Sequence, residues 1–336
     1  MKKLVVVSLS FLLFMQVNLN IAFADNHPRN LYDIKAGDTL WKIAHTYGTS
    51  IGDLKLVNGL QSDLIRVGQR LRVPLMYEVV SGDTLWKLSQ SFDSSVQAIK
   101  TVNGLTADTI FIGQDIKIPP KKLNMQGQFI LMTREEFRDW LFNQRFSRKI
   151  GKVQQHHTYQ PSYKTFNGSN HFNLLRGMAD YHMNTMKWNN ISQHLTTFPD
   201  GTVAVGRPFN SPPQGSYGLK NPEAMLANQA DALTIENVGD FNAGNDQMTK
   251  AQRETIITVT ALLMLKFGLT PSIDSIQYHR WWDINTGERV LDKSEGHAVK
   301  TCPGTGFFGG NTTTDAKNNF YPLVEQKMQE IRATIQ

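Results

Sequence analysis

The sequence is poor in the features that mark several classes of protein. Its 336 residues contain a single cysteine, so a disulfide scaffold is excluded because each bridge needs two. Thirteen prolines and 25 glycines are ordinary counts, which exclude collagen and a wholly disordered chain. The formal charge of +6 is spread along the chain and gives no indication of a nucleic-acid partner. The length predicts two or three domains.

Residues 1–24 have the layout of a secretory signal peptide. A cationic start at Lys2 and Lys3 precedes an apolar run, and Ala22-Phe23-Ala24 supplies small residues ahead of the cleavage site. We expect cleavage before Asp25, which leaves 33 basic and 29 acidic residues and a charge of +4. The alternative is an uncleaved membrane anchor. No later apolar run reaches the roughly 18 residues that a membrane helix needs, so we expect an exported, soluble protein with no membrane contact after cleavage.

The next ninety residues are a tandem repeat. Residues 32–74 align on residues 77–119 with a constant offset of 45 and no gaps, and 18 of the 43 pairs are identical. Solenoids and propellers need at least three copies to bury a core, so two copies indicate two small modules that fold independently. Each reads as strand, helix, helix, strand. Thr39 and Thr84 are candidate helix N-caps, and the Asn-Gly pairs at 58–59 and 103–104 are helix stops.

Both modules resemble LysM modules. The motif Gly-Asp-Thr-Leu-Trp-Lys, a later Asn-Gly-Leu, and Gly-Gln before a closing strand and proline occur in each. The resemblance implies binding of N-acetylglucosamine-containing glycans, here peptidoglycan, by the first strand–helix turn together with the loop that precedes the last strand. Carried over to this chain, the glycan-binding residues are Gly37, Asp38, Thr39, Leu40, Leu60, Ile65, Gly82, Asp83, Thr84, Leu85, Leu105 and Ile110. Helical spacing among apolar neighbours places Trp41 and Trp86 in the core.

The remaining residues predict one α/β domain with a mixed central sheet flanked by helices. Thr133 and Glu136 form a capping box that opens a helix to about residue 144, and Thr249 opens another that closes at Gly268. Strand-like segments lie near residues 153–156, 196–198, 203–205 and 232–236, and Pro-Asp-Gly at 199–201 predicts a hairpin. We therefore divide the chain into a signal peptide (1–24), two βααβ modules (31–74 and 76–119), a linker (120–128) and a C-terminal domain (129–336).

Seven histidines and Cys302 fall in the C-terminal domain. The lone thiol of an exported protein is a buried side chain, a nucleophile or a metal ligand, and composition does not choose among these. The chain has no His-x-x-x-His or Cys-x-x-Cys pair, so a metal site would have to be assembled from distant segments.

Five short motifs in this domain resemble those of the zinc amidase family that includes peptidoglycan recognition proteins and phage lysozyme-type amidases. They are Gln-His-His-Thr at 155–158, Ile-Ser-Gln-His at 191–194, Pro-Asp-Gly-Thr at 199–202, Tyr-His-Arg at 278–280 and Lys-Thr-Cys-Pro-Gly at 300–304. The resemblance implies hydrolysis of the amide between N-acetylmuramic acid and L-alanine. It also implies Zn²⁺ held by His156, His279 and Cys302, a catalytic Glu236, and Lys300 as the group that stabilises the oxyanion.

Together these residues supply every group that metal-assisted amide hydrolysis needs. Two imidazoles and one thiolate leave a fourth position on Zn²⁺ open, as in catalytic zinc sites. His157 and His297 are the competing ligands, and we place both outside the set; we take Asp283 and Glu288 as surface charges. Many family members carry a tyrosine where this chain has Gln193, which shifts the proton-transfer role to Glu236.

Two other functions compete with a secreted or wall-associated monomeric amidase. A Cys-His peptidase that cuts the stem peptide would need a thiolate of low pKa, whereas Cys302 precedes a proline and no histidine follows it. A non-catalytic peptidoglycan-binding protein would not need Cys302, Lys300 and Glu236. Chelation and thiol alkylation distinguish the three functions.

Overall fold

The computed structural model describes residues 30–214 and 230–333, so the predicted signal peptide lies outside the described residues. Each repeat folds as two helices against a two-stranded antiparallel sheet, as the sequence predicts. The elements of the first module are β1 (Leu31–Asp33), α1 (Leu40–Tyr47), α2 (Ile51–Asn58) and β2 (Arg70–Arg72). Those of the second module are β3 (Leu75–Glu78), α3 (Leu85–Ser91), α4 (Val96–Asn103) and β4 (Asp115–Ile118).

The predicted helix signals of the repeats are confirmed. Thr39 and Thr84 accept hydrogen bonds from the backbone N–H three residues later, and Gly59 and Gly104 end the second helices with φ of +59° and +65°. The placement of Trp41 and Trp86 in the core was wrong, because their exposed fractions are 64% and 65%. A helix of seven or eight residues buries only a narrow face against so small a sheet, and in α1 that face is taken by Leu40, Ile43 and Ala44.

The C-terminal domain is built on a seven-stranded mixed sheet, which confirms the predicted fold class. The strand order is β11-β7-β10-β8-β9-β6-β5. β11, β7, β10 and β8 run parallel, whereas β9, β6 and β5 pair antiparallel with their neighbours. The strands are β5 (Asn124–Gln126), β6 (Phe129–Met132), β7 (Lys152–His157), β8 (Leu195–Thr197), β9 (Val203–Val205), β10 (Ala232–Asn237) and β11 (Ile276–Tyr278).

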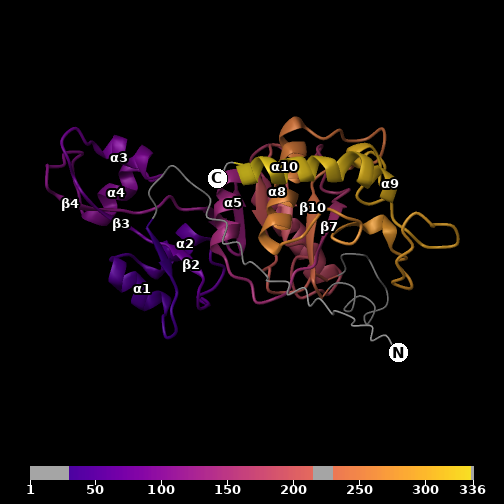
Figure 1. Cartoon of the computed structure of the whole chain (residues 1–336), viewed down its shortest axis with the longest axis horizontal. Coiled ribbons are helices and arrows are strands. Elements are labelled where there is room, and N and C mark those ends of the chain that lie inside the picture. Colours follow the sequence, from indigo (N-terminus) through magenta and orange to yellow (C-terminus); the bar gives the residue numbers. More distant parts are fainter. Residues whose placement is uncertain (1–29, 215–229, 334–336) are drawn as a thin grey trace, which may run out of the picture.

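Helices cover both faces of this sheet. On one face α8 packs against α5 and α10 over the main apolar core, and Figure 1 shows α8 and α10 lying together across the strands. On the other face α6 packs its apolar side chains against the sheet in a smaller core. The helices and helical turns are α5 (Arg134–Asn143), α6 (His171–Asp180), η1 (Tyr181–Thr185), α8 (Lys250–Phe267), η2 (His279–Trp281), η3 (Phe307–Gly309), α9 (Thr313–Asp315), η4 (Ala316–Phe320) and α10 (Tyr321–Ala333).

Two further points concern the predicted boundaries. The predicted capping box of Thr133 and Glu136 and the Gly268 stop are both present, and β8 and β9 form the predicted hairpin. The segment expected to be a linker, residues 120–128, contains β5, which extends the sheet at its edge by pairing with β6. Among the described residues, no helix is long and apolar enough to cross a membrane.

Candidate metal centre and active site

The candidate catalytic and metal-binding side chains of the C-terminal domain lie where its parallel strands end. His156 is the fifth residue of β7, and Glu236 is the fifth residue of β10 directly opposite it in the register. His279 follows the last residue of β11 and begins the turn η2. Because the carboxyl ends of parallel strands meet at one edge of a sheet, three segments that are distant in sequence bring these side chains together.

His156, His279 and Cys302 form one compact group. Their candidate ligand atoms all lie within 4.8 Å of one another, and this is the group of potential metal ligands found among the described residues. The imidazole rings of His156 and His279 have centroids 5.0 Å apart, and Cys302 Sγ lies 3.5 Å from His156 Nδ1. Arg280 N–H donates to the Cys302 carbonyl over 2.8 Å, which holds the cysteine loop against η2. The sequence-predicted ligands are therefore adjacent in space.

Glu236 connects this group to a cleft. Its Oε1 lies 4.0 Å from His156 Nδ1, and its Oε2 is buried without a hydrogen-bond partner among the described residues. The cleft has a volume of about 430 Å³ and runs from Glu236 between the end of β7 and the helix α6. It is lined by His157, Thr158, Gln160, Pro161, Asn173, Leu174, Gly177, Met178, Tyr181, His182 and Glu236. A ligand in the cleft would therefore meet a carboxyl group beside the three candidate ligands.

Burial shifts the pKa values of His156, Glu236 and Cys302. It lowers the pKa of His156 well below the ordinary value, with the neighbouring His279 acting in the same direction, so the imidazole is neutral and able to bind a metal. It raises the pKa of Glu236 to about 8 and raises that of the Cys302 thiol well above its ordinary value. A dication held by these side chains would lower both acidic pKa values, because an opposite charge favours the ionised form.

A buried polar network, which the sequence did not reveal, fixes the ends of the strands. Asn237 donates through Nδ2 to the His156 carbonyl over 2.7 Å and to Gln155 Oε1 over 3.1 Å. Its Oδ1 accepts from Thr197 Oγ1 over 2.7 Å, and Gln252 of α8 donates to Thr197 in turn. The network joins β7, β10 and β8 immediately behind His156 and Glu236. Nothing in the local sequence marks these residues, since the contacts span 40 to 82 positions.

The competing histidines lie outside the group. His157 Nδ1 accepts from the Phe241 N–H, and His297 Nδ1 lies 3.1 Å from Asp283 Oδ2. Taking Asp283 as a surface charge was wrong, because it is 4% exposed. Its carboxylate accepts hydrogen bonds from three backbone N–H groups of its loop, which hold its pKa well below the ordinary value. Glu288 is exposed, as expected.

The other residues that the sequence singled out have separate surroundings. The Lys300 side chain is exposed, and its charge acts on the Cys302 thiol by lowering its pKa against the larger effect of burial. Gln193 is fully buried and donates to Thr196 Oγ1 over 3.2 Å and to the Met178 sulfur over 3.4 Å. Met178 lines the cleft, so Gln193 supports the cleft wall from behind.

The residues expected to bind glycan divide into two kinds. Leu40, Leu60 and Leu85 are 2–5% exposed and serve the module cores. Asp38 stabilises its turn by accepting from the Tyr32 hydroxyl and the Lys35 N–H, and Asp83 does the same in the second module. The exposed members are Gly37, Thr39, Gly82 and Thr84, and the partly exposed ones are Ile65, Leu105 and Ile110.

Comparison with known proteins places both copies of the repeat in one family of small domains. The LysM domain family matches residues 32–74 and 77–119, so the chain carries two LysM domains. The chain is 57% identical over 42 residues to "Probable peptidoglycan endopeptidase LytE" of Bacillus subtilis, which corresponds to 12% of this chain and 13% of that protein. It is 43% identical over 54 residues to "N-acetylmuramoyl-L-alanine amidase sle1" of Staphylococcus epidermidis, covering 16% of this chain and 17% of that protein. The matches thus span less than a fifth of these relatives.

Two solved structures resemble part of the chain. "N-acetylmuramoyl-L-alanine amidase LysC from Clostridium intestinale URNW" is 22% identical with a TM-score of 0.32, covering 48% of this chain and 80% of that one. "Drosophila PGRP-LB wild-type" is 20% identical with a TM-score of 0.37, covering 53% and 86%. These partial likenesses assign no chemistry to the C-terminal domain.

Proposed function

We propose that the chain is a secreted peptidoglycan hydrolase, a zinc-dependent N-acetylmuramoyl-L-alanine amidase that the LysM domains bring to the cell wall. The observation that carries the proposal is the group of His156, His279 and Cys302 within 4.8 Å, with Glu236 beside it at a cleft. The LysM domains support peptidoglycan as the polymer that is bound. Export through residues 1–24, action as a monomer and the absence of a nucleic-acid partner belong to the same proposal.

The donor set fits zinc. Two imidazoles and one thiolate are ligands that Zn²⁺ prefers, and three protein ligands leave a position open for chemistry. Glu236 lies beside this group, with Oε1 4.0 Å from His156 Nδ1, and its buried Oε2 has no hydrogen-bond partner among the described residues. His156, His279 and Cys302 would hold the ion, and the bound ion would supply Lewis acidity for amide hydrolysis at neutral pH.

The chain's own residues would then orient the substrate and move the proton. Glu236 would take a proton from the attacking water at its carboxylate and pass it to the amide nitrogen, because an amine leaves poorly without protonation. Lys300 would meet the negative charge that develops on the carbonyl oxygen, where one well-placed donor contributes about 3 kcal/mol. The side chains of α6 and the end of β7 would position the muramoyl peptide in the cleft.

A specific contact favours one competing function. Cys302 Sγ lies 3.5 Å from His156 Nδ1, which is a spacing that a thiol–imidazole peptidase could use. The burial that raises the pKa of the thiol opposes this function, since a nucleophilic cysteine needs a lowered pKa. A third function, binding of peptidoglycan without catalysis, would leave the metal group unused.

Digestion of purified peptidoglycan tests the proposal. We expect new amino groups on L-alanine without new reducing ends, loss of this activity after chelation, and recovery when zinc is added back. Activity that survives chelation and is abolished by a thiol alkylator would instead support the peptidase. If no amine is released under any condition, the chain is a peptidoglycan-binding protein without this catalytic activity.

A further inference from the structure

The two LysM domains, equal in sequence pattern, are not equal in their surroundings. Figure 1 shows the first module, with α2 and β2, lying beside α5 of the C-terminal domain, whereas α3 and α4 lie farther out. A methyl group added at Gly59 would come within 2.8 Å of the Trp140 ring, and one added at Gly68 within 2.9 Å of Arg145. The equivalent glycines of the second module, Gly104 and Gly113, have nothing within 4 Å. The first module alone is therefore docked through these positions.

Buried hydrogen bonds join the first module to α5. Gln144, at the end of α5, donates to the Asn58 carbonyl over 3.1 Å and accepts from Gln69 Nε2 over 3.1 Å. Trp140 Nε1 donates to the Gly59 carbonyl over 3.4 Å. Asn58, Gln69, Trp140 and Gln144 are each less than 9% exposed. Polar side chains are rarely buried in a loose contact, so this interface is a built part of the fold.

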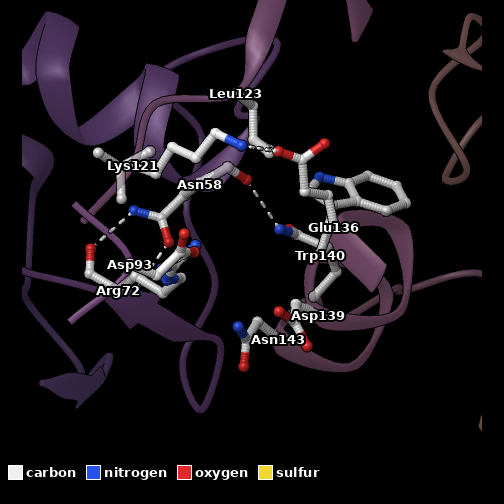
Figure 2. A pocket seen from close by; sticks show the side chains of 11 residues that line it. Asn58, Arg72, Asp93, Lys121, Leu123, Glu136, Asp139, Trp140 and Asn143 are labelled. Atoms are coloured by element: carbon white, nitrogen blue, oxygen red, sulfur yellow. Dashed lines mark hydrogen bonds and ion pairs between the residues drawn. The ribbon is translucent and has the colours of Figure 1, made fainter. Parts of the chain in front are cut away.

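The chain returns to this interface after it has formed the second module. Leu123 N–H donates to the Leu56 carbonyl of α2 over 2.8 Å, and Lys121 forms an ion pair of 3.0 Å with Glu136 of α5. Figure 2 shows Lys121 reaching Glu136 across the junction, close to Asn58 and Trp140. The space left between the parts is about 20 Å³, which is room for roughly one water molecule. The junction is closely packed.

The loop expected to bind glycan is itself part of the contact. Gln61 of the first module donates through Nε2 to the Gln128 carbonyl over 2.6 Å and to the Gly206 carbonyl over 3.0 Å. The neighbouring residues 62–64 remain exposed, as do Gly37 and Thr39 of the first strand–helix turn. Docking therefore fixes one rim of the glycan-binding region to the C-terminal domain and leaves the region open.

The contact lies toward the β5 side of the sheet, whereas the metal group lies toward the β11 side. Gly206 follows β9 and Gln128 lies between β5 and β6, whereas His156 and Glu236 lie on β7 and β10. Neighbouring strands lie about 4.8 Å apart, and β9 is two strands away from β10 and three away from β7, so roughly 10–15 Å across the sheet separates Gly206 from Glu236 and His156. The glycan held by the first module would then be a part of the polymer away from the bond that is cut.

We propose that the first LysM domain is a fixed glycan subsite of the catalytic domain rather than a flexible tether. This inference rests on the proposed function. It follows that a substrate long enough to reach both the subsite and the cleft is cleaved more efficiently than a short one, because the second contact becomes intramolecular at a set geometry. The second LysM domain would bind wall glycan without this coupling.

The chain supplies a matched pair of variants for the test. Gly59→Ala and Gly104→Ala place the same methyl group at the same left-handed helix stop, so the backbone strain is shared and only Gly59→Ala meets Trp140. Gln144→Ala weakens the interface from the other side without altering either LysM domain. The full chain is assayed on a disaccharide-peptide fragment and on soluble glycan-peptide strands of increasing length.

We expect kcat/KM to rise with strand length in the wild type and in Gly104→Ala. In Gly59→Ala and Gln144→Ala, kcat/KM on long strands should fall by about tenfold, while turnover of the fragment stays unchanged. Hydrogen exchange should be faster over residues 134–143 in these two variants only. If all four proteins share the same length dependence, or none shows any, the fixed subsite is overturned.

Failure of the proposed function would look different. A wild type that releases no amino group from the fragment or the strands would refute the amidase. The docking would then be judged by hydrogen exchange alone, and equal exchange over residues 134–143 in Gly59→Ala and Gly104→Ala would refute it. If Gly59→Ala does not fold, Gln144→Ala against the wild type gives the same comparison.

Discussion

Replacing Asn237 with alanine tests whether the network behind the metal group stabilises the domain. The change removes three hydrogen bonds, to the His156 carbonyl, Gln155 Oε1 and Thr197 Oγ1, at a site that is fully buried. At about 0.5–1.5 kcal/mol each, the free energy of unfolding should fall by about 2–4 kcal/mol. For a domain of this size that corresponds to a loss of roughly 4–16 °C in Tm.

The assay is thermal and urea unfolding of the full chain, followed by circular dichroism and compared with Asn245→Ala. Asn245 is exposed and its side chain donates to Asp240 Oδ2, so its replacement should change stability by less than about 0.5 kcal/mol. Because Asn237 holds the carbonyl of His156, its replacement should also weaken zinc retention. A stability loss below about 1 kcal/mol, or equal losses in the two variants, would refute the structural role of the network.

Two further predictions concern Glu236 and Lys266. Glu236→Gln keeps the size of the side chain but removes the carboxylate, so turnover of peptidoglycan should fall by about 10²–10⁴-fold while zinc content stays at the wild-type level; normal turnover would contradict the assigned role. Burial, helped by the charge of Arg145, lowers the pKa of Lys266 to about 8, so the unfolded chain binds more protons between about pH 8 and 10. The stability of the wild type should therefore rise with pH in this window relative to Lys266→Met, and parallel pH profiles in chemical unfolding would contradict the shift.

The local structure could be predicted where the sequence carries local signals. The offset of 45 residues, the threonine caps and the Asn-Gly stops defined both LysM domains, and the Pro-Asp-Gly turn defined the hairpin. The helix α6 carried no such signal, because its N-cap residue Asn170 makes no side-chain capping hydrogen bond. The helix α10 continues directly from η4 without a cap of its own and was likewise not predicted.

In the candidate site, too, local motifs could be predicted from the sequence, whereas contacts between distant segments could not. The motifs around His156, His279 and Cys302 predicted a group of side chains that the structure brings together. Each of these motifs spans only a few consecutive residues, so it can be recognised from the sequence alone. The burial of Asp283 and the exposure of Trp41 depend on which face the tertiary structure covers, and helical spacing alone gave the wrong answer for Trp41. The Asn237 network and the docking of the first LysM domain are contacts between distant segments, which no local pattern encodes.

The zinc content of the purified protein tests the central claim most directly. Measured by mass spectrometry after dialysis against metal-free buffer, the wild type and His297→Ala should each hold about one zinc per chain. Cys302→Ala, which leaves two imidazoles to hold the ion, should retain almost none under the same dialysis. Equal zinc in Cys302→Ala and the wild type, or a wild type that binds none from a zinc-containing buffer, would contradict a metal centre built from His156, His279 and Cys302.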